Sequence, residues 1–473
     1  MKADFTKLDR AFNPKTVAVV GASKKNNFHW LNNLREFQGT VYSVQVNPES
    51  IEGIKALGIE NYTSLLDIPG PVDLVIVNLP RALAPQVLDD CIRKEAGAVH
   101  FFSSGFGETG TEEGIGLERS LIEKAERVDF HIVGINCRGI FTPKIGLKQI
   151  GEQYSGISGS VGLISQSGGH AMTFSRQAYP QGIYINKSIS FGNGIVLHAS
   201  DFLEYFGQDP EIKMIGMYLE GVKDGRRFFR SLKEVSARKP VVIWKGGRTT
   251  DGGRAIASHT GSLAIPDSVW EAAVRQSGAI SVPGLDEMID TLKALHFLPP
   301  IPGERIGVAG GAGGESIAIT DILAEAGLKV PELTQKSYDE LDTFFSLVGG
   351  SYRNPIDTDI GLNRRHLARV LGILANDPNI DNLILMTRVG AFLYSKELQD
   401  TDIDIALNIK KKTSKPLLAV LSYVTPEEMK EMVEVIPRYQ DDGIPVFSSM
   451  NRAAIALKNA LDYHKPRFGN GLT

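Results

Sequence analysis

Two residues in the middle of the chain have the types and positions that phosphoryl or proton transfer needs. His259 lies in the Gly/Ser/Thr-rich stretch 246–264, directly after the apolar run VVIWK. We expect this histidine on a mobile loop, where it can act as a general base or as a nucleophile. Glu220 ends the run 214–220, where its carboxylate can hold one ring nitrogen of His259 so that the other can attack. Both residues are also compatible with solvated positions that have no catalytic role.

Other motif-based chemistries find no support in the sequence. There is no HExxH and no second histidine near His259 that would indicate a metal site. There is also no GxSxG, which a serine hydrolase of the α/β class would carry after a strand. We therefore expect no resident metal, and His259 stays a candidate base or nucleophile.

A second candidate site is the turn Gly21-Ala22-Ser23, which follows the apolar run 16–20. Backbone N–H groups at such a strand-to-helix turn bind anions, with help from the helix dipole. The exposed Lys25 can add a contact to phosphate. An NAD site would need GxGxxG and an acidic residue at the end of the second strand, where this chain has Asn47-Pro48. NAD is thus disfavoured, while another phosphate-bearing nucleotide and a plain tight turn both stay open.

Three segments of similar pattern divide the chain. Each has a short β-branched run, a Gly/Ser-rich turn and a helix-like pattern, and they begin at 16, 160 and 305. Apolar runs of four to eight residues alternate with amphipathic stretches after each of them, which predicts parallel sheets covered on both faces. The runs lie at 41–46, 74–80, 98–104, 131–136, 187–193, 214–220, 240–247, 382–389, 416–423 and 444–450.

Two breaks in the pattern set the expected domain boundaries. The stretch 150–159 is polar and rich in Gly and Ser, and 298–305 carries closely spaced prolines. We therefore predict an α/β protein of three doubly wound parallel-sheet domains, at 1–150, 151–299 and 300–473.

The composition excludes several classes of protein. The 473 residues carry a formal net charge of -4, which argues against a broad basic surface for nucleic acid. No apolar run approaches the roughly 18 residues that a membrane span needs, and the opening residues lack a secretory signal. Two cysteines without a CxxC provide neither a disulfide framework nor a cysteine-based zinc site. We expect a cytoplasmic protein.

These segments together resemble a known family, the NDP-forming acyl-CoA synthetases, and in particular their ADP-forming alpha subunits, which are related to succinyl-CoA synthetase. The resemblance implies a CoA-binding Rossmann-like domain followed by two flavodoxin-like domains. The matching strings occur in the family's order over nearly the whole chain: FNPKTVAVVGAS, VNP, PVDLVIVNLP, FFSSGFGETG, GINC, GLISQSGG, YLEGVKDG, KGGRT, ASHTGSLA and NPIDT.

The resemblance also implies roles for particular residues. His259 would carry a phosphoryl group between an acyl-phosphate and a nucleotide, and Glu220 would steady the phosphorylated form. The attacking thiol would be that of coenzyme A, so Cys137 need not be a nucleophile. The residues expected at coenzyme A are Gly21, Ser23, Lys25, Asn47, Pro48, Asn78 and Pro80, with Asn136 and Cys137 near its thiol end. Those expected at phosphate are Ser165, Ser167, Gly168 and Gly169.

The sequence departs from the family's pattern at three places. Residues 24–30 read KKNNFHW where a Gly-containing stretch is usual, and GINCRG replaces GPNC followed by an apolar residue or proline. The segment 190–202 keeps Gly-Asn but lacks an acidic residue that often follows. These departures indicate an altered acyl pocket, or a protein that no longer ligates.

The three domains leave no stretch for an ATP-grasp module, and there is no GxxxxGK[ST]. The resemblance then implies that ATP or ADP binds with Mg²⁺ on a separate ATP-grasp beta subunit of a hetero-oligomer. We predict an acid–thiol ligase that converts a small organic acid, CoA and ATP reversibly to acyl-CoA, ADP and phosphate. The alternative is a non-catalytic CoA-binding regulatory subunit, which would have no need of the pair His259 and Glu220.

Overall fold

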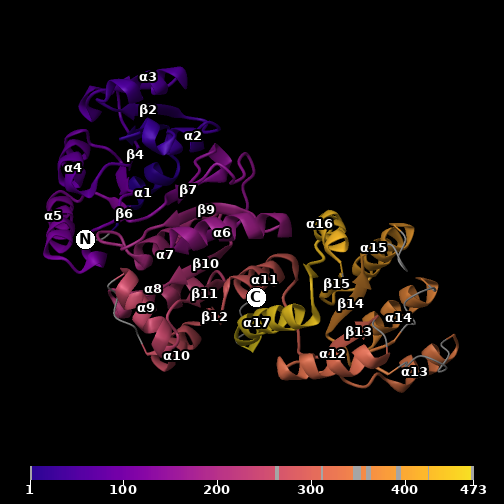
Figure 1. Ribbon diagram of the computed structural model, residues 1–473. Helices are drawn as coiled ribbons and strands as arrows, with labels where there is room; N and C mark the ends of the chain where they lie inside the picture. The colour runs from indigo at the N-terminus through magenta and orange to yellow at the C-terminus, as the bar shows by residue number, and fades with distance from the viewer. Residues whose placement is uncertain are drawn as a thin grey trace. The chain divides into compact units, whose positions relative to one another are not determined.

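The computed structural model describes residues 3–260, 266–310, 313–344, 353–357, 364–389, 396–423 and 425–469, without the side chains of 256–260, 313, 396 and 466–469. The chain forms two compact units (Figure 1). Unit 1 is Met1–Tyr179 with Tyr184–Leu285, and unit 2 is Pro180–Ile183 with Asp286–Thr473. No helix in the described ranges has the length and apolar character of a membrane span.

The first sheet of unit 1 has six parallel strands in the order β3-β2-β1-β4-β5-β6. Its central strand reads TVAVV and is buried from Val17 onward, as β-branched residues favour. The strand order reverses between β1 and β4, and ligands bind at the carboxyl ends of strands beside such a reversal. The strands are β1 Thr16–Val20, β2 Thr40–Val44, β3 Glu60–Tyr62, β4 Leu74–Val77, β5 Ala98–Phe101 and β6 Ile132–Ile135.

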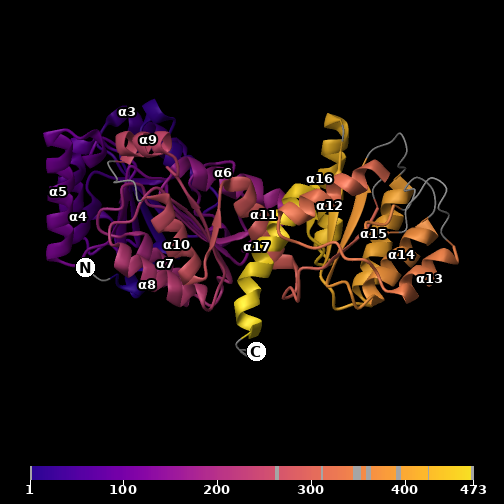
Figure 2. The same cartoon turned by 90° about the horizontal axis from the view of Figure 1, so that it is seen from below.

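Helices pack on both faces of this sheet. Helices α4 and α5 lie side by side in both ribbon views (Figures 1 and 2). The side chain of Thr111 accepts the N–H of Gly114 and so begins α5, whose first turn carries Glu112 and Glu113 where the helix dipole favours acids. The helices are α1 Phe5–Phe12, α2 His29–Asn33, α3 Pro48–Ala56, α4 Ala84–Arg93 and α5 Glu112–Arg127, with the short 3₁₀ turns η1 Lys24–Asn26, η2 Leu65–Asp67, η3 Arg81–Leu83, η4 Gly107–Thr109 and η5 Pro143–Ile145.

The second sheet of unit 1 has the order β12-β11-β10-β8-β9-β7. Its strands are parallel except β7, which pairs antiparallel with β9. The order reverses at β8, so the crevice of this sheet lies at the carboxyl ends of β8, β9 and β10. The strands are β7 Gly139–Phe141, β8 Val161–Ser165, β9 Ile185–Ser190, β10 Met214–Leu219, β11 Val241–Lys245 and β12 Ile280–Val282.

The helices around the second sheet follow from capping and apolar spacing. The Asp224 side chain accepts the N–H of Arg227 and begins α8, and Phe228, Leu232 and Val235 form its buried face. The elements are α6 Gly168–Ala178, η6 Tyr179–Gln181, α7 Ala199–Gln208, α8 Gly225–Ser236, α9 Thr250–Thr260 and α10 Asp267–Ser277.

Unit 2 contains a four-stranded parallel sheet in the order β13-β14-β15-β16, with helices packed against it. Its strands are β13 Ile306–Ala309, β14 Asn382–Arg388, β15 Leu417–Ser422 and β16 Val446–Phe447. Its helices are α11 Leu285–Phe297, α12 Gly313–Glu325, α13 Gln335–Asp342, α14 Arg364–Asn376, α15 Lys396–Lys410, α16 Pro426–Gln440 and α17 Met450–Gly469.

The predicted fold class is confirmed, because every predicted apolar run overlaps a strand and the strands form three α/β sheets that are almost entirely parallel. Three strands were not predicted: β3, β7 and β12. Each is three residues long and lacks a continuous apolar run, so its strand signal is weak. Strand β7 precedes residue 150 yet joins the second sheet, and the exact domain limits stay predictions.

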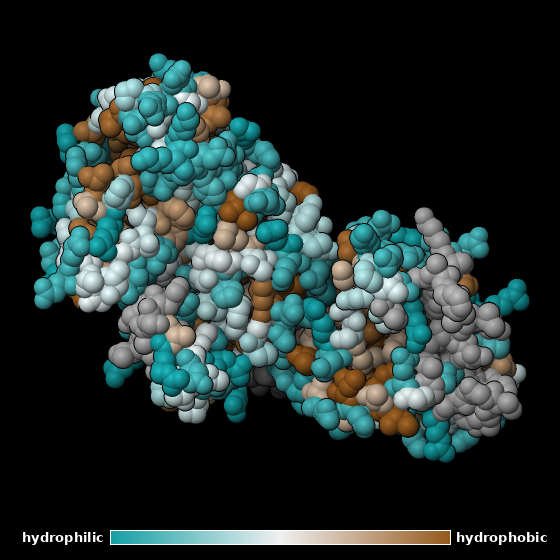
Figure 3. Space-filling model, in the orientation of Figure 1, coloured by the Kyte–Doolittle hydropathy of each residue, from teal (hydrophilic) through white to brown (hydrophobic). Residues whose placement is uncertain are grey.

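The outer surface is largely polar on the face drawn in Figure 3, where hydrophilic side chains surround smaller apolar patches. Scattered apolar side chains on a surface are ordinary in soluble proteins. One of the more exposed is Val46, at 69% exposure, which immediately precedes Asn47. It therefore lies beside one of the segments predicted to bind coenzyme A.

The two sheets of unit 1 approach each other closely at Gly134, in β6. A Cβ atom there would lie 2.3 Å from the carbonyl oxygen of Phe191, and neither backbone can move away easily. We expect Gly134→Ala to lower the unfolding free energy of unit 1 by about 1–3 kcal/mol. Urea unfolding followed by tryptophan fluorescence measures this, because the three tryptophans, Trp30, Trp244 and Trp270, all belong to unit 1.

The matched control is Gly116→Ala, within α5, where an added Cβ would meet no atom within 4 Å. Alanine favours a helix interior over glycine, so this variant should gain up to about 1 kcal/mol. Equal effects of the two substitutions would contradict the close approach at Gly134.

Candidate functional site

The segments predicted to bind coenzyme A meet at the carboxyl edge of the first sheet. Gly21 follows β1 with φ of +90°, and an added Cβ would lie 2.6 Å from the carbonyl oxygen of Asn78. Glycine is therefore required where the ends of β1 and β4 approach each other. Gln45 donates from Nε2 to the carbonyl oxygen of Ala22 at 2.7 Å, which ties the end of β2 to the same turn.

The other predicted residues of this edge build turns and helix caps. Asn47 caps α3 by accepting the N–H of Ser50 at 3.1 Å, and Pro48 is the first residue of that helix. Ser23 precedes η1, Lys25 is an exposed residue of η1, and Pro80 is exposed after β4. The structure thus brings the predicted segments together at one reversal point of the strand order.

Asn136 connects the carboxyl edges of the two sheets. It has φ of +52°, a left-handed conformation that asparagine tolerates better than most residues. Its side-chain amide donates to Oδ1 of Asn193 at 3.4 Å, and Asn193 donates to Glu108 at 2.7 Å. Glu108 also accepts the N–H of Phe106 at 3.0 Å, so its carboxylate holds its own loop together. These side chains join segments that follow β5, β6 and β9.

Cys137 is unsuited to nucleophilic chemistry. Its side chain is buried, and its Sγ lies 4.0 Å from the carbonyl oxygen of Phe101. Burial raises the pKa of Cys137 to about 12, so the thiolate form is scarce at neutral pH. The buried Cys137 thiol is therefore a poor nucleophile in the native chain.

The turn Ser165–Gly169 forms the start of α6. Ser165 Oγ donates to the carbonyl oxygen of Ser167 at 2.7 Å, and Ser167 accepts the N–H of His170 at 3.3 Å as the helix cap. The N–H groups of Gly168 and Gly169 belong to the first helical turn, where no helix carbonyl is available to them. This geometry suits a bound anion.

Glu220 is hydrogen-bonded into this turn. Oε1 of Gln166 accepts the N–H groups of Glu220 and Gly221, the latter at 3.0 Å, so the end of β10 is fixed to the turn after β8. The Glu220 side chain is buried, and Tyr218 donates its hydroxyl to Oε1 of Glu220 at 3.3 Å. Burial, followed by the charge of this carboxylate, raises the pKa of Tyr218 and keeps its hydroxyl protonated as a donor.

A cavity of about 660 Å³ borders this turn at the carboxyl edge of the second sheet. Loops that follow β8, β9 and β10 form one wall, and η4 and α5 form the other. The lining includes apolar side chains and both signs of charge, as a site for an amphiphilic ligand requires. Its wall residues include Gln166, Asn193, Glu118, Val222, Lys223 and His198.

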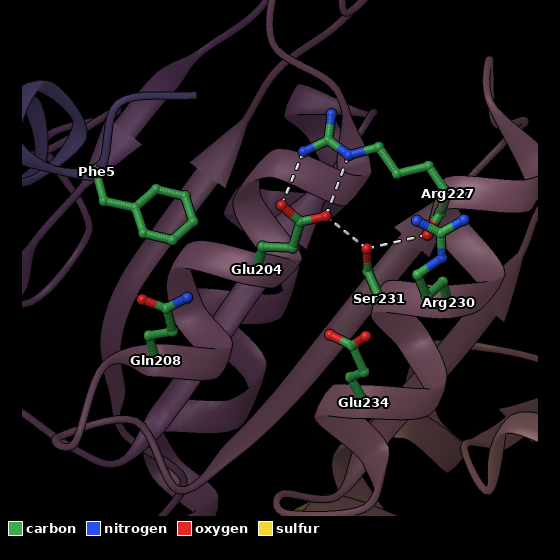
Figure 4. A pocket seen from close by; sticks show the side chains of 7 residues that line it. All are labelled: Phe5, Glu204, Gln208, Arg227, Arg230, Ser231 and Glu234. Atoms are coloured by element: carbon green, nitrogen blue, oxygen red, sulfur yellow. Dashed lines mark hydrogen bonds and ion pairs between the residues drawn. The ribbon is translucent and has the colours of Figure 1, made fainter. Parts of the chain in front are cut away.

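A second hollow, also about 660 Å³, lies among α1, α7 and α8 (Figure 4). Arg227 binds Glu204 at 2.8 Å and the buried Asp201 at 2.7 Å, and Ser231 donates to Glu204 at 2.6 Å. These polar groups satisfy one another on the faces of helices. We therefore assign the functional site to the strand ends.

The expectation of a loop around His259 was wrong over part of its length. Residues Thr250–Thr260 form α9, so the backbone of His259 is helical. Gly, Ser and Thr lower helix propensity, but the packing of α9 against η4 outweighs that local preference. The side chain of His259 and residues 261–265 lie outside the described part of the structure, so the pairing of His259 with Glu220 stays a prediction.

The carboxyl edge of the first sheet fits coenzyme A by its chemistry. It offers neutral amides at Asn78 and Asn136 and the buried Ser103 hydroxyl, which has no hydrogen-bond partner among the described residues. Neutral donors and acceptors suit the amide-containing pantetheine arm, while the exposed lysines 24 and 25 suit phosphates. No group of three or more metal-ligating side chains occurs within the described ranges.

Comparisons with known proteins agree with this fold and site. Residues 15–143 match the family model of a CoA binding domain, and residues 158–295 match that of a succinyl-CoA ligase like flavodoxin domain. The two together define a CoA ligase of the succinyl-CoA ligase type. The alpha subunit of ADP-forming acetate–CoA ligase II from Pyrococcus furiosus is 36% identical over 95% of this chain and 96% of its own length. This chain belongs to the family of ADP-forming acetate–CoA ligase alpha subunits.

Two further matches extend this result. ADP-forming acetate–CoA ligase I of Archaeoglobus fulgidus is 33% identical over 97% of this chain, which spans 64% of that relative. The solved structure of dinucleotide forming acetyl-coenzyme A synthetase 1 from Ca. Korarchaeum cryptofilum, in complex with phosphate and ADP, has a TM-score of 0.84 and 29% identity, covering 98% of this chain and 97% of that one. The resemblance drawn from the motifs and the expectation of coenzyme A are confirmed.

Sequence reasoning missed several residues that build the site. Gln166, Asn193, Glu108 and Tyr218 were not predicted to have a role, although each lies in or beside a quoted motif. Each lies in the last residues of a predicted strand or in the loop that follows one, and the sequence does show this position. The partner that each one binds is set by loops far apart in the chain, and no spacing reveals it.

We expect Cys137 in the native chain to resist maleimide at pH 8, because its buried thiol keeps its proton. An unfolded thiol titrates near pH 9, so the unfolding free energy should fall as the pH rises above 9. Mass spectrometry of labelled native and urea-unfolded protein measures both cysteines. Cys91 is also buried and serves as the internal control, and rapid labelling of native Cys137 would contradict its inert role.

Proposed function

We propose that this chain is the alpha-type subunit of an ADP-forming acyl-CoA synthetase. The reversible reaction joins a small organic acid to coenzyme A at the expense of ATP and yields ADP and phosphate. His259 carries the phosphoryl group, and Glu220 holds the imidazole in the orientation that accepts it. The family relationship supports the reaction class, and the strand-end geometry supports the place where it occurs.

In the direction of ATP synthesis the reaction has three steps. A phosphate oxygen attacks the thioester carbonyl, the C–S bond breaks, and coenzyme A leaves with a proton as the thiol. A ring nitrogen of His259 then attacks the phosphorus of the acyl-phosphate, and the acid leaves as its carboxylate. Finally a terminal oxygen of ADP takes the phosphoryl group from the histidine. The covalent intermediate divides one difficult transfer into two easier ones.

One observation carries the proposal: the backbone at the buried Glu220 is hydrogen-bonded to a turn whose N–H groups suit an anion. Gln166 binds the N–H groups of Glu220 and Gly221, and it lies between the turn residues Ser165 and Ser167. The turn can bind phosphate through the first N–H groups of α6. Glu220 lies at the same sheet edge from which α9, with His259, follows β11. A negative oxygen beside a cationic phosphohistidine stabilises its charge.

The nucleotide is proposed to bind on a separate ATP-grasp beta subunit, together with Mg²⁺, which neutralises phosphate charge during transfer. The length comparison supports this division. The relative from Archaeoglobus fulgidus matches this chain over 64% of its length and continues beyond the match. We also propose the domain limits 1–150, 151–299 and 300–473 and a cytoplasmic location, which the free, buried cysteines support.

Phosphoryl transfer through His259 is tested by incubating the chain with its partner subunit, Mg²⁺ and γ-labelled ATP. Wild type should acquire an acid-labile label, and His259→Asn should lose more than 99% of it because the accepting nitrogen is gone. His296→Asn, on α11, is the matched control and should label like wild type. Equal labelling of His259→Asn and wild type would contradict the proposal.

Glu220→Gln tests the orienting carboxylate. The side chain keeps its size and can still accept from Tyr218, but it loses the negative charge beside the imidazolium. We expect kcat to fall about ten- to a hundredfold, with a smaller effect on the KM of coenzyme A. A variant with unchanged kcat would contradict the role of Glu220, and a wild-type chain that binds coenzyme A without turnover would favour a regulatory subunit.

A further inference from the structure

Arg138 places a positive charge between the two sheet edges of unit 1. It directly follows Cys137, and its N–H donates to Ser190 Oγ at 3.2 Å. Its aliphatic chain covers the first residue of α6, because a Cβ on Gly168 would lie 2.7 Å from Arg138 Cγ. Its guanidinium carbon lies 4.8 Å from the centre of the Phe102 ring, at the end of β5. The Arg138 side chain therefore extends from the turn Ser165–Gly169 toward the first sheet.

The protein partner of this guanidinium is neutral. Nε2 of His29 lies 3.1 Å from Nη1 of Arg138 and 3.2 Å from Nδ2 of Asn33. Arginine and the asparagine amide nitrogen can only donate, so Nε2 is the acceptor of an uncharged ring. Burial, followed by the charge of Arg138, lowers the pKa of His29 in agreement with this tautomer.

No carboxylate of the described residues forms an ion pair with Arg138, whereas Arg10, Arg81, Arg227 and Arg305 each bind an Asp or Glu. The Arg138 side chain is also half-buried, so water solvates its charge only in part. A guanidinium has five N–H donors, and one of them is committed to His29. Burying a charge without a counter-ion is costly unless a ligand supplies one.

We propose that Arg138 binds a second anionic group of the acid substrate, so that the enzyme prefers dicarboxylic acids to monocarboxylic acids of equal length. This inference rests on the proposed function. In the proposed function the reacting carboxyl group and the phosphoryl group bind at the turn that begins α6, which has its own N–H donors. The guanidinium extends away from that turn, toward Phe102 and His29. A planar guanidinium binds a carboxylate through two parallel hydrogen bonds.

The test compares succinate with butyrate in acyl-CoA formation by the chain and its partner subunit. Wild type should favour succinate at least tenfold in kcat/KM. Arg138→Leu should lower kcat/KM for succinate about ten- to a hundredfold and leave butyrate within about twofold. Arg138→Lys keeps the positive charge but cannot form two parallel hydrogen bonds to a carboxylate. Its fall in kcat/KM for succinate should therefore be intermediate.

Arg10→Leu is the matched control. Arg10 is also half-buried but binds Asp73, whose carboxylate accepts the N–H groups of Lys15 and Thr16 at the opposite edge of the sheet. It should lose stability without any change in the preference between the two acids. The comparison of Arg10→Leu with Arg138→Leu separates the effect of a lost charge on stability from its effect on substrate preference.

Other outcomes overturn the inference. A wild type without preference, or an equal loss for both acids in Arg138→Leu, would exclude a role in acid recognition. A selective rise in the KM of phosphate or of coenzyme A would show that the anion belongs to that substrate instead. If wild type forms acyl-CoA from no small organic acid, the proposed function fails separately. Calorimetric titration of the chain with succinate and butyrate then decides whether Arg138 binds the dicarboxylate.

Discussion

The site in unit 1 depends on the close meeting of the carboxyl edges of its two sheets. Gly192, in the loop after β9, has φ of +55°, and an added Cβ would lie 2.2 Å from the carbonyl oxygen of Ile135. The hydrogen bonds from Asn136 through Asn193 to Glu108 cross the same junction. Because both crevices open at carboxyl ends of strands, this contact places the expected coenzyme A segments beside the expected phosphate turn. A shift of either sheet would separate them.

The polar groups at this junction differ in charge between the coenzyme A segments and the turn Ser165–Gly169. Around the coenzyme A segments the side chains are mostly neutral amides and hydroxyls, and the carboxylates of Glu108 and Glu118 are occupied by backbone N–H groups at 3.0 Å. Near the phosphate turn the anion-binding capacity comes from backbone N–H groups and from Arg138. Neutral side chains suit the uncharged thioester of an acyl-CoA. Backbone N–H groups and a guanidinium suit the negatively charged phosphate and carboxylate groups of the reaction.

Much of the fold could be predicted because short apolar runs, turns and their spacing are local properties. The run TVAVV gives a central strand, and the glycine turns follow strands as expected. Strands β3 and β7 were not predicted because a run of three residues carries little periodicity. The stretch before His259 was predicted as a loop from its small residues, but packing against η4 makes it the helix α9.

The sequence by itself determined the family, the three α/β domains and the motifs expected at coenzyme A and phosphate, because these follow from residue type and order. The tertiary structure decided which of those motifs touch. It joined Gln166 to Glu220, buried Cys137, and set the neutral His29 against Arg138. The physical reason is that charge, burial and hydrogen-bond partners depend on residues brought together from more than 50 positions apart in the chain, which no local pattern encodes.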